Sequence, residues 1–281
     1  FTKASQELFV SQPAITKHIQ ELEAAYQTRL FDRQGSRISL TEAGKLLLEH
    51  CERILEDYKR LEYEMHLLHN EYTGGLKLGA STTVAQYVLP PLLASFIGKF
   101  PHVNLSLLNG NSREIEAALQ EHRIDLGFVE GVFRLPNIKY TTFLKDELVA
   151  VVRTGSKLAI GEEITPEELL HLPLVLRERG SGTLDVFERA LQQHNIKLSS
   201  LQVLMYLGST ESIKLFLEHT DCLGIVSIRS ITRELYSGQL RVVEIKDMPM
   251  LRDFSFAQPQ GQESGLAQVF MQFAMHYNNK L

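Results

Sequence analysis

The sequence predicts an α/β protein with an all-α start, made of a small helical region, one long helix and two α/β lobes. Three observations favour this fold class. The 281 residues leave room for about two domains of typical size. Apolar side chains recur at helical spacing in the first part of the chain, which is typical of amphipathic helices. From Leu76 onward, short apolar strands alternate with helices, and this alternation restarts near Leu174.

The composition excludes several classes of protein. Hydrophobic residues make up 44% and charged residues 22%, so the chain can bury a core and is not disordered. No stretch has the roughly 18 consecutive apolar residues of a membrane span, and the start lacks a basic segment followed by an apolar run. Cys51 and Cys222 form no pattern typical of zinc binding. These features predict a cytoplasmic, bacterial-type protein without a structural metal.

Residues 1–25 fit two helices joined by a tight turn. Phe1–Val10 has a short helical pattern, and a second helix starts at Ser11-Gln12-Pro13, because serine caps a helix and proline is tolerated in the first turn. An apolar stripe, expected to be buried, leaves polar side chains on the other faces. Glutamine and threonine can read base edges, whereas lysine and the first amides of a helix suit phosphates. The stripe is Ile15, Ile19 and Leu22, and the polar set is Gln12, Pro13, Thr16, Lys17 and Gln20.

Residues 33–40 look like a β-hairpin that turns on Gly35-Ser36. This wing would hold Arg37 against a minor groove. Two helices and a wing are typical of a winged helix-turn-helix DNA-binding domain. The alternative is a solvated helical hairpin. The whole chain has 29 Lys and Arg against 34 Asp and Glu, so a surface for nucleic acid must be local.

A resemblance to a known family favours DNA binding. The first fifty residues are similar, without a gap, to the DNA-binding region of LysR-type transcriptional regulators, with SQPAIT, LFDR and LTEAG matching the family motifs. The resemblance implies that Ser11, Gln12, Pro13, Thr16 and Lys17 face DNA and that Arg37 lies in the wing. Thr16 and Lys17 replace the commoner serine and arginine of the family, which alters their reach. The resemblance also implies that the family's first helix is missing before Phe1.

One long helix is predicted from the cap at Thr41 to a break at Gly74-Gly75. Its apolar side chains alternate spacings of four and three, which is the seam of a helix that packs lengthwise on a partner. Dimerisation through this seam is favoured over packing on the same chain, because the neighbouring segments are short. The resemblance agrees, since LysR-type regulators pair through this helix. The residues predicted for dimerisation are Leu47, Ile54, Tyr58, Leu61, Met65 and Leu68, with Cys51 packed among them.

The rest of the chain reads as a βα pattern with a mostly parallel sheet, which gives two lobes. The predicted strands are Leu76–Gly79, Val103–Leu108, Ile124–Val129 and Glu147–Val152, then Leu174–Leu176, Gln202–Leu207, Leu223–Val226 and Leu240–Ile245. The predicted helices are Val84–Phe100, Glu114–Glu121, Thr183–His194, Ser209–Leu217 and Leu266–Tyr277.

Four loops between these strands and helices are small and rich in hydroxyl groups. In α/β sheets, ligands bind at loops beyond the carboxyl ends of the strands, where helix N-termini offer amides to an anion. Each loop alone is explained as well by a plain helix cap, but four together favour an anion site with an arginine as counter-charge. The predicted effector-binding residues are Ser81, Thr82, Asn111, Ser112, Arg179, Ser181, Gly182, Thr183 and Thr210.

Residues 75–281 resemble the effector-binding domain of LysR-type regulators, itself similar to periplasmic solute-binding proteins. The motifs GFVEG, RERGSGT and LGST look like a branch that controls sulfur assimilation or carbon fixation genes. The resemblance implies that the chain crosses between lobes near Val152 and Leu251. The predicted domains are therefore 1–45, the linker helix 46–74 and the effector domain 75–281, with lobe I at 75–151 and 252–281 and lobe II at 152–251.

No catalytic or metal site is predicted. The sequence has no G-x-S-x-G or HExxH motif, and the pair His66 and His69 lacks a third ligand. The predicted function is a sequence-specific DNA-binding regulator, not an enzyme, that needs no cofactor and responds to a small anionic metabolite between its lobes. The expected partners are an interrupted inverted repeat in double-stranded DNA, this effector, further copies in a dimer or tetramer, and RNA polymerase, but no membrane. The alternative is a cytoplasmic solute-binding module without operator binding.

Overall fold

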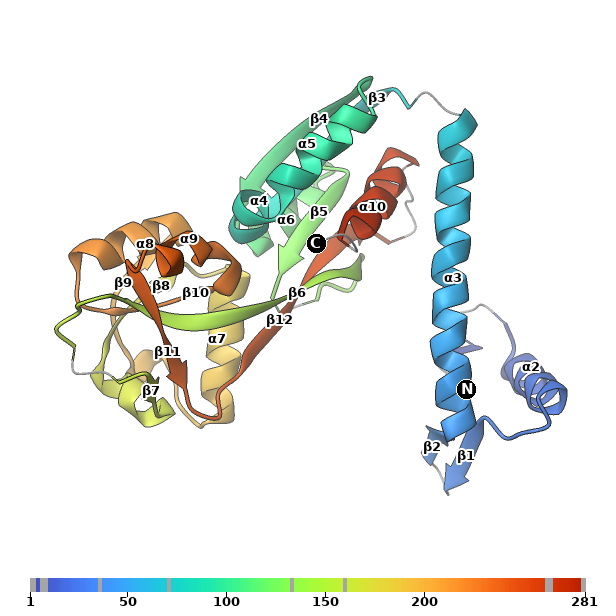
Figure 1. Ribbon diagram of the computed structural model, residues 1–281, viewed down its shortest axis with the longest axis horizontal. Coiled ribbons are helices and arrows are strands. Elements are labelled where there is room, and N and C mark those ends of the chain that lie inside the picture. The colour runs from blue at the N-terminus through green and yellow to red at the C-terminus, as the bar shows by residue number, and fades with distance from the viewer. Residues whose placement is uncertain are drawn as a thin grey trace. The chain divides into compact units, whose positions relative to one another are not determined.

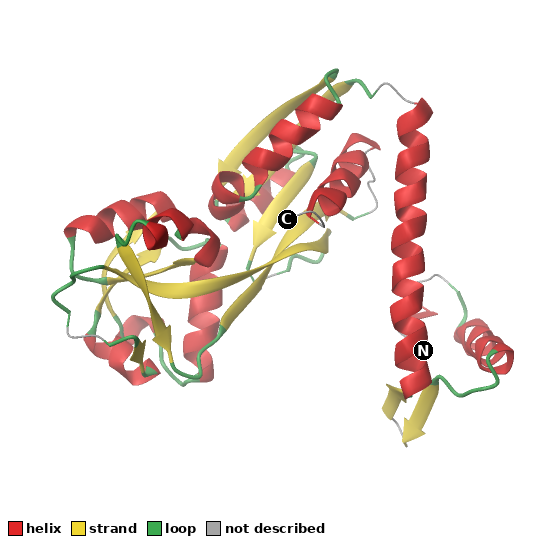
Figure 2. Cartoon of the chain, viewed as in Figure 1, coloured by secondary structure: helices red, strands yellow, loops and turns green. Residues whose placement is uncertain are grey.

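The computed structural model describes residues 4–5, 10–34, 37–69, 72–131, 134–158, 161–260 and 265–278. The chain divides into two compact units, Phe1–His69 and Asn70–Leu281, and each is described by itself. Figure 1 labels their helices and strands. The first unit consists of helices and one small hairpin, whereas the second mixes helices with a large sheet (Figure 2).

The first unit contains α2 (Gln12–Ala25), β1 (Phe31–Gln34), β2 (Arg37–Leu40) and α3 (Glu42–His69). The predicted start of α2 is confirmed, because Ser11 is its N-cap and the Ser11 hydroxyl accepts a long hydrogen bond from the Ala14 amide, at 3.4 Å. The predicted helical pattern in residues 1–10 falls largely outside the described residues.

The predicted wing is present as an antiparallel hairpin in which Gln34 pairs with Arg37. Its turn at Gly35-Ser36 lies outside the described residues. The carboxylate of Glu23 on α2 accepts the amide of Leu30 at 2.8 Å. A Cβ atom at Gly44 on α3 would overlap the Leu30 carbonyl oxygen, so only glycine allows this approach. The hairpin is thus fastened to both helices.

The burial predicted for the apolar stripe of α2 is wrong in extent. Ile15 and Ile19 are half-buried and Leu22 is 41% exposed, so none of the residues of α2, all of which the structure describes, is buried. A second helix and two four-residue strands give this small unit little apolar surface with which to cover the stripe.

The long helix α3 begins one residue after its predicted cap, because Thr41 accepts the Gly44 amide at 3.0 Å. It ends at His69, earlier than the predicted break at Gly74-Gly75. These two glycines do not form a loop: they start β3 and pair with Val103 and Asn104. The glycines therefore mark the first strand of the second unit.

The second unit is built on one ten-stranded sheet (Figure 1). Its main path runs in the order β4-β3-β5-β12-β6-β10-β8-β9, and β11 and β7 extend it from β6. The strands are β3 (Gly74–Ser81), β4 (Val103–Gly110), β5 (Leu126–Glu130), β6 (Ile138–Arg153), β7 (Glu163–Ile164), β8 (Pro173–Arg177), β9 (Gln202–Leu207), β10 (Leu223–Ser227), β11 (Leu240–Ile245) and β12 (Met250–Pro259).

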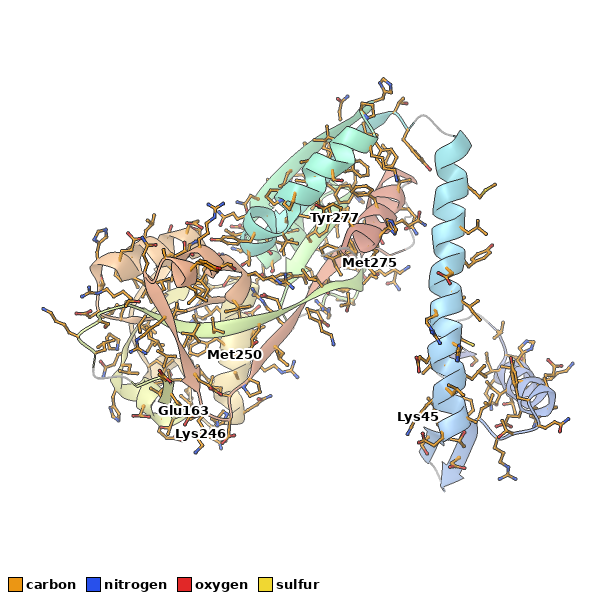
Figure 3. All side chains as sticks on the ribbon, viewed as in Figure 1. Lys45, Glu163, Lys246, Met250, Met275 and Tyr277 are labelled. Carbon is orange, nitrogen blue, oxygen red and sulfur yellow. The ribbon has the colours of Figure 1, made fainter. Side chains whose placement is uncertain are left out.

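Lobe I comprises β3, β4 and β5, which are parallel, with α4 (Thr82–Tyr87), α5 (Leu89–Lys99), α6 (Ser112–Gln120) and α10 (Gly265–Asn278). The single helix predicted over 84–100 is in fact α4 and α5. The helical ladder breaks at Val88, because prolines follow at the start of α5 and cannot donate to it. Aromatic rings fill the core beneath α5 and α10, and Tyr277, labelled in Figure 3, stacks on Phe273.

Lobe II comprises β8, β9 and β10, which are parallel, together with β7, β11, α7 (Gly182–Gln193), α8 (Thr210–His219) and α9 (Thr232–Tyr236). Apolar clusters cover both faces of its sheet, one under α7 and one under α8. Three 3₁₀ helices that were not predicted lie at Pro166–His171, Leu198–Ser200 and Ile228–Ser230.

Two long antiparallel strands, β6 and β12, connect the lobes and run side by side in Figure 1. β6 pairs with β12 up to Leu148 and then with β10 and β11, so it belongs to both lobes. It starts nine residues before the predicted Glu147, and β12 was not predicted at all. The reason is physical: Arg252 is buried inside β12, where its charge is paired, although charges in a sequence ordinarily indicate a surface.

Candidate functional site

The residues predicted to contact DNA cluster at the start of α2. Ser11, Gln12, Pro13 and Lys17 are exposed. Gln12 Nε2 donates to Thr16 Oγ1 at 3.3 Å, and Thr16 Oγ1 donates to the Gln12 carbonyl at 3.2 Å, so these two side chains share one face. The first turn contains no acidic residue, which leaves its positive end open to a phosphate. The backbone of Arg37 lies in β2, and its side chain is outside the described part of the chain.

The predicted seam of α3 is not covered within the chain. Ile54, Tyr58, Leu61 and Met65 are all about half exposed or more, and Leu61 has 54% of its surface open. Leu47 is half-buried, Cys51 is exposed, and the side chain of Leu68 is not described. Apolar side chains spaced along one helix face and left open to solvent favour packing on another chain.

Arg177, the last residue of β8, is the centre of the contact between the lobes. Its side chain is 1% exposed. Nη1 donates to Thr210 Oγ1 in lobe II, and Nη2 donates to Thr82 Oγ1 in lobe I, each at 3.4 Å. The Glu178 carboxylate accepts hydrogen bonds from Nε of Arg177 at 2.8 Å and from Nη2 at 3.0 Å. A buried guanidinium therefore joins two of the predicted effector-binding hydroxyls.

Ser81, next to Thr82, holds a buried hydroxyl without a hydrogen-bond partner among the described residues. Leaving such a group unpaired costs about 1–3 kcal/mol, so the Ser81 hydroxyl is a hydrogen-bonding group still available next to Thr82. Together, Ser81, Thr82, Arg177, Glu178 and Thr210 are called the inter-lobe site below.

A second buried cation, Arg252, organises the hinge strands. Its Nε lies 2.7 Å from Asp146 Oδ2 and its Nη1 donates to Thr183 Oγ1 at 3.0 Å. Thr83 and Thr183, from the two lobes, both donate to Glu130 Oε1, at 3.3 and 3.4 Å. Arg252 Nη2 and Glu130 Oε2 approach to 3.1 Å as an ion pair without hydrogen-bond geometry. The predicted effector residue Thr183 thus lies in a hinge network.

Three other predicted residues are used locally. Asn111 forms a capping box with Glu114 at the start of α6, and Ser181 caps α7 through the Leu184 amide. The Ser112 hydroxyl donates to the Glu130 carbonyl at 2.8 Å. Asn111 and Ser181 thus fulfil the helix-cap alternative for their loops, whereas Ser112 fastens the start of α6 to the end of β5.

Gly182 is required where the lobes meet. A Cβ atom at this position would overlap the Glu130 carbonyl oxygen. One further contact joins the same loops, since the Arg113 amide donates to the Gly180 carbonyl at 3.3 Å. The predicted loops of lobe I and lobe II are therefore brought together.

Arg179 does not lie in the inter-lobe site. Its side chain is exposed and lines a cavity of about 320 Å³ with Glu188, Lys197 and Tyr206 on lobe II. The arginine that contacts the hydroxyls of the inter-lobe site is Arg177, and not Arg179, which the sequence predicts as the counter-charge of an anion. Both arginines belong to the segment Arg177-Glu178-Arg179, and the only signal that distinguishes them is that Arg177 directly follows the apolar run of a strand.

The rim of the inter-lobe site carries a polar bridge that the sequence did not reveal. Tyr87 on α4 donates to Glu211 on α8. Lys214 lies 2.7 Å from Glu211 and 2.8 Å from Glu234. Burial raises the pKa of Tyr87, and its bond to Glu211 raises it further, whereas hydrogen bonds from Lys214 and Tyr87 hold the pKa of Glu211 below its usual value despite burial.

A cavity of about 320 Å³ lies beside the hinge, between α6 and the start of α7. Its carboxyl groups include Glu116, which accepts the Tyr140 hydroxyl at 2.6 Å, and Asp185. Burial raises the pKa of both carboxyl groups. Among the described residues, no group of three or more His, Cys, Asp or Glu residues is arranged to hold a metal ion.

Comparison with known proteins agrees with both units. Residues 1–45 match the model of the "Bacterial regulatory helix-turn-helix protein, lysR family", and residues 69–278 match the "LysR substrate binding domain". No described helix is both long enough and apolar enough to cross a membrane.

The chain is 34% identical to the uncharacterized HTH-type transcriptional regulator YeiE of Escherichia coli, over 87% of this chain and 80% of that protein. It is 31% identical to a probable RuBisCO transcriptional regulator of Cyanidioschyzon merolae, over 97% of this chain and 91% of that protein. Among solved structures, the regulatory domain of Synechocystis CcmR in complex with 2-PG has 27% identity and a TM-score of 0.67, and covers 74% of this chain and 99% of that domain. The chain belongs to the LysR-type transcriptional regulators, with a helix-turn-helix domain and an effector-binding domain.

Proposed function

We propose that the effector of this regulator is a small anion bound at the inter-lobe site. Arg177 carries the proposal, because it is a buried cation that contacts hydroxyls of both lobes. Ser81, which precedes Thr82 in the chain, has a buried hydroxyl without a partner among the described residues and could add a donor. Phosphate, sulfur oxyanions and carboxylates all accept several such hydrogen bonds. The CcmR domain, which resembles this one, is described in complex with 2-PG, and this supports a small ligand here.

Calorimetry on the full chain tests the effector. The panel contains sulfate, thiosulfate, sulfite, inorganic phosphate, 2-PG and small carboxylates. Arg177→Ala is expected to lower the affinity for the anion that binds by at least tenfold, since charge-assisted hydrogen bonds contribute about 1.5–3 kcal/mol each. Arg179→Ala is the matched control, because it removes the same charge from an exposed side chain of the same segment. Equal loss in both variants, or binding of uncharged ligands only, would refute the anion assignment.

We also propose that the protein acts in the cytoplasm as a homodimer or homotetramer, without catalysis, on an interrupted inverted repeat at promoters, where it meets RNA polymerase. The exposed start of α2 and the uncovered seam of α3 support this, because two-fold symmetric proteins bind two-fold symmetric sites. Target genes of carbon fixation are supported by the likeness to the RuBisCO regulator.

Gel shifts against the DNA next to the gene test operator binding. Gln12→Ala or Thr16→Ala should cost about 1–3 kcal/mol at one base position, whereas Lys17→Ala should weaken binding to all sequences and flatten its salt dependence. Gln192→Ala, which changes an exposed glutamine of the other unit, is the control. If all variants bind DNA as tightly as the control does, α2 is not the recognition helix. Effector binding without any DNA binding would instead indicate a solute-binding module.

A further inference from the structure

Glu178 binds Nε and Nη2 of Arg177, which form the edge of the guanidinium group that an external anion would also bind. Its two carboxylate oxygens accept from Nε at 2.8 Å and from Nη2 at 3.0 Å. This two-point geometry is the one in which guanidinium groups bind carboxylates and phosphates. The side chain of Arg177 is 1% exposed, and that of Glu178 is 26% exposed. The buried cation is therefore already neutralised, and by a partner that keeps access to solvent.

The other contacts of Arg177 are weaker. Its bonds to Thr82, Thr210 and the Gly208 carbonyl measure 3.3–3.4 Å. In the described part of the chain, Arg177 is the only hydrogen-bond or ion-pair partner of the Glu178 side chain. Rotation of this side chain toward solvent would therefore break no second interaction, while its backbone stays fixed by the bond from the Glu178 amide to the Leu207 carbonyl.

We propose that Glu178 is an internal competitor for the effector: its carboxylate holds Arg177 when the site is empty and must leave when an anion binds. This inference rests on the proposed function, because it assumes an anion at the inter-lobe site. It predicts that Glu178 sets both the affinity and the selectivity of the site, since every anion must outbind a carboxylate that is already in place.

The expected selectivity is for tetrahedral oxyanions over planar carboxylates. A ligand carboxylate only exchanges one pair of oxygens at Arg177 for another. A phosphate or sulfate group brings further oxygens, which can accept from the hydroxyls of Ser81 and Thr210. The hydroxyl of Ser81 is the donor that has no partner among the described residues before a ligand arrives.

Glu178→Gln in the full chain tests the proposal, because the amide keeps the shape of the side chain and removes its charge. Calorimetry with inorganic phosphate, sulfate and acetate as probes should show binding about tenfold tighter than to the unchanged protein. The gain should be largest for acetate, so that the preference for phosphate over acetate narrows. If Glu178 instead only positions Arg177, the substitution lowers the affinity for every anion, which is the opposite of the expected change.

Two controls separate the possible failures. Glu188→Gln removes the same charge from the same lobe, but Glu188 lines a cavity with Arg179 and is not at Arg177. This variant should leave the affinity for anions unchanged. Thermal unfolding checks that each variant is folded. If anions bind and depend on Arg177, but Glu178→Gln weakens them or has no effect, only the competitor role is overturned. If no anion binds to any variant, the effector assignment and the competitor role both fail.

Discussion

Arg177 and Arg179 are two residues apart, yet one is buried between lobes and the other is exposed on lobe II. Sequence patterns identify the loop that contains them, because its small and hydroxyl residues come directly before a helix. They do not identify which arginine faces the other lobe, since this depends on the exact end of β8 and strand ends are uncertain by a residue or two. The same limit explains why the sequence places Arg179 with the hydroxyls of Thr82 and Thr210, whereas the cation that contacts them in the structure is Arg177.

Thr183→Val tests the hinge network at the residue scale. The valine has nearly the same shape, but it leaves Arg252 Nη1 without its acceptor and Glu130 Oε1 without one donor. We expect the free energy of unfolding to fall by about 1–3 kcal/mol, because these buried polar groups lose their partner. Urea denaturation measures this change. Thr154→Val, at an exposed threonine, is the control and should change stability by less than about 0.5 kcal/mol.

Cys222 gives a pH dependence with a definite sign. Burial, helped by Asp221, raises the pKa of its thiol from 9.0 to about 11. The folded state therefore holds this proton more tightly than the unfolded state, so the free energy of unfolding should fall as pH rises from about 9 to about 11. Denaturation of the unchanged protein and of Cys222→Ala across this window should show a smaller slope for the variant. An equal slope would mean that another group is responsible.

At the scale of elements, periodicity predicted most of the longer strands and helices that lie inside one lobe, but not the short β7, α9 and three 3₁₀ helices. It failed at β12, where Arg252, Ser255 and Gln258 are polar but buried in a strand shared by the lobes. The burial of Arg252 and Ser255 is favourable because they bond to Asp146, Thr183 and Arg134, and such long-range pairs are not visible in a local pattern. The break between α4 and α5 was missed because prolines were taken as part of one helix instead of the first turn of a second.

The seam of α3 makes a prediction at this scale. Leu61→Asp places a charge in the middle of the proposed contact between two copies, where its desolvation would cost several kcal/mol. We expect sedimentation to show a shift from dimer, or tetramer, toward smaller species. Leu46→Asp is the matched control, because Leu46 is also exposed on α3 but is directed away from the seam by the helical repeat. If both variants keep the oligomer of the unchanged protein, the copies pair through another surface.

For the molecule as a whole, a ligand can shift the lobes only by binding one arrangement more tightly than the other. Within the second unit, several contacts join the lobes, and two of them differ in how they relate to the proposed anion. Arg177 bonds to Thr82 at the site itself, and Tyr87 bonds to Glu211 at the rim. Binding of the proposed anion would change the Arg177 contact but not the Tyr87 contact. We therefore expect the rim bridge to influence how closed the empty protein is, and with it how much closure is left for the proposed effector to cause.

Tyr87→Phe tests this division. The variant loses the hydroxyl that crosses between lobes, while Glu211 keeps its ion pair with Lys214. We expect the empty protein to open more often, so hydrogen exchange should rise in α4 and α8, and the anion should bind several-fold more weakly because it must now close the lobes itself. The ratio of operator affinities with and without the anion should increase for the same reason. Tyr236→Phe, at a tyrosine that is 94% exposed, is the control. If Tyr87→Phe matches this control in exchange and in anion affinity, the bridge does not govern closure, and the arrangement of the lobes is set by Arg177 and the hinge alone.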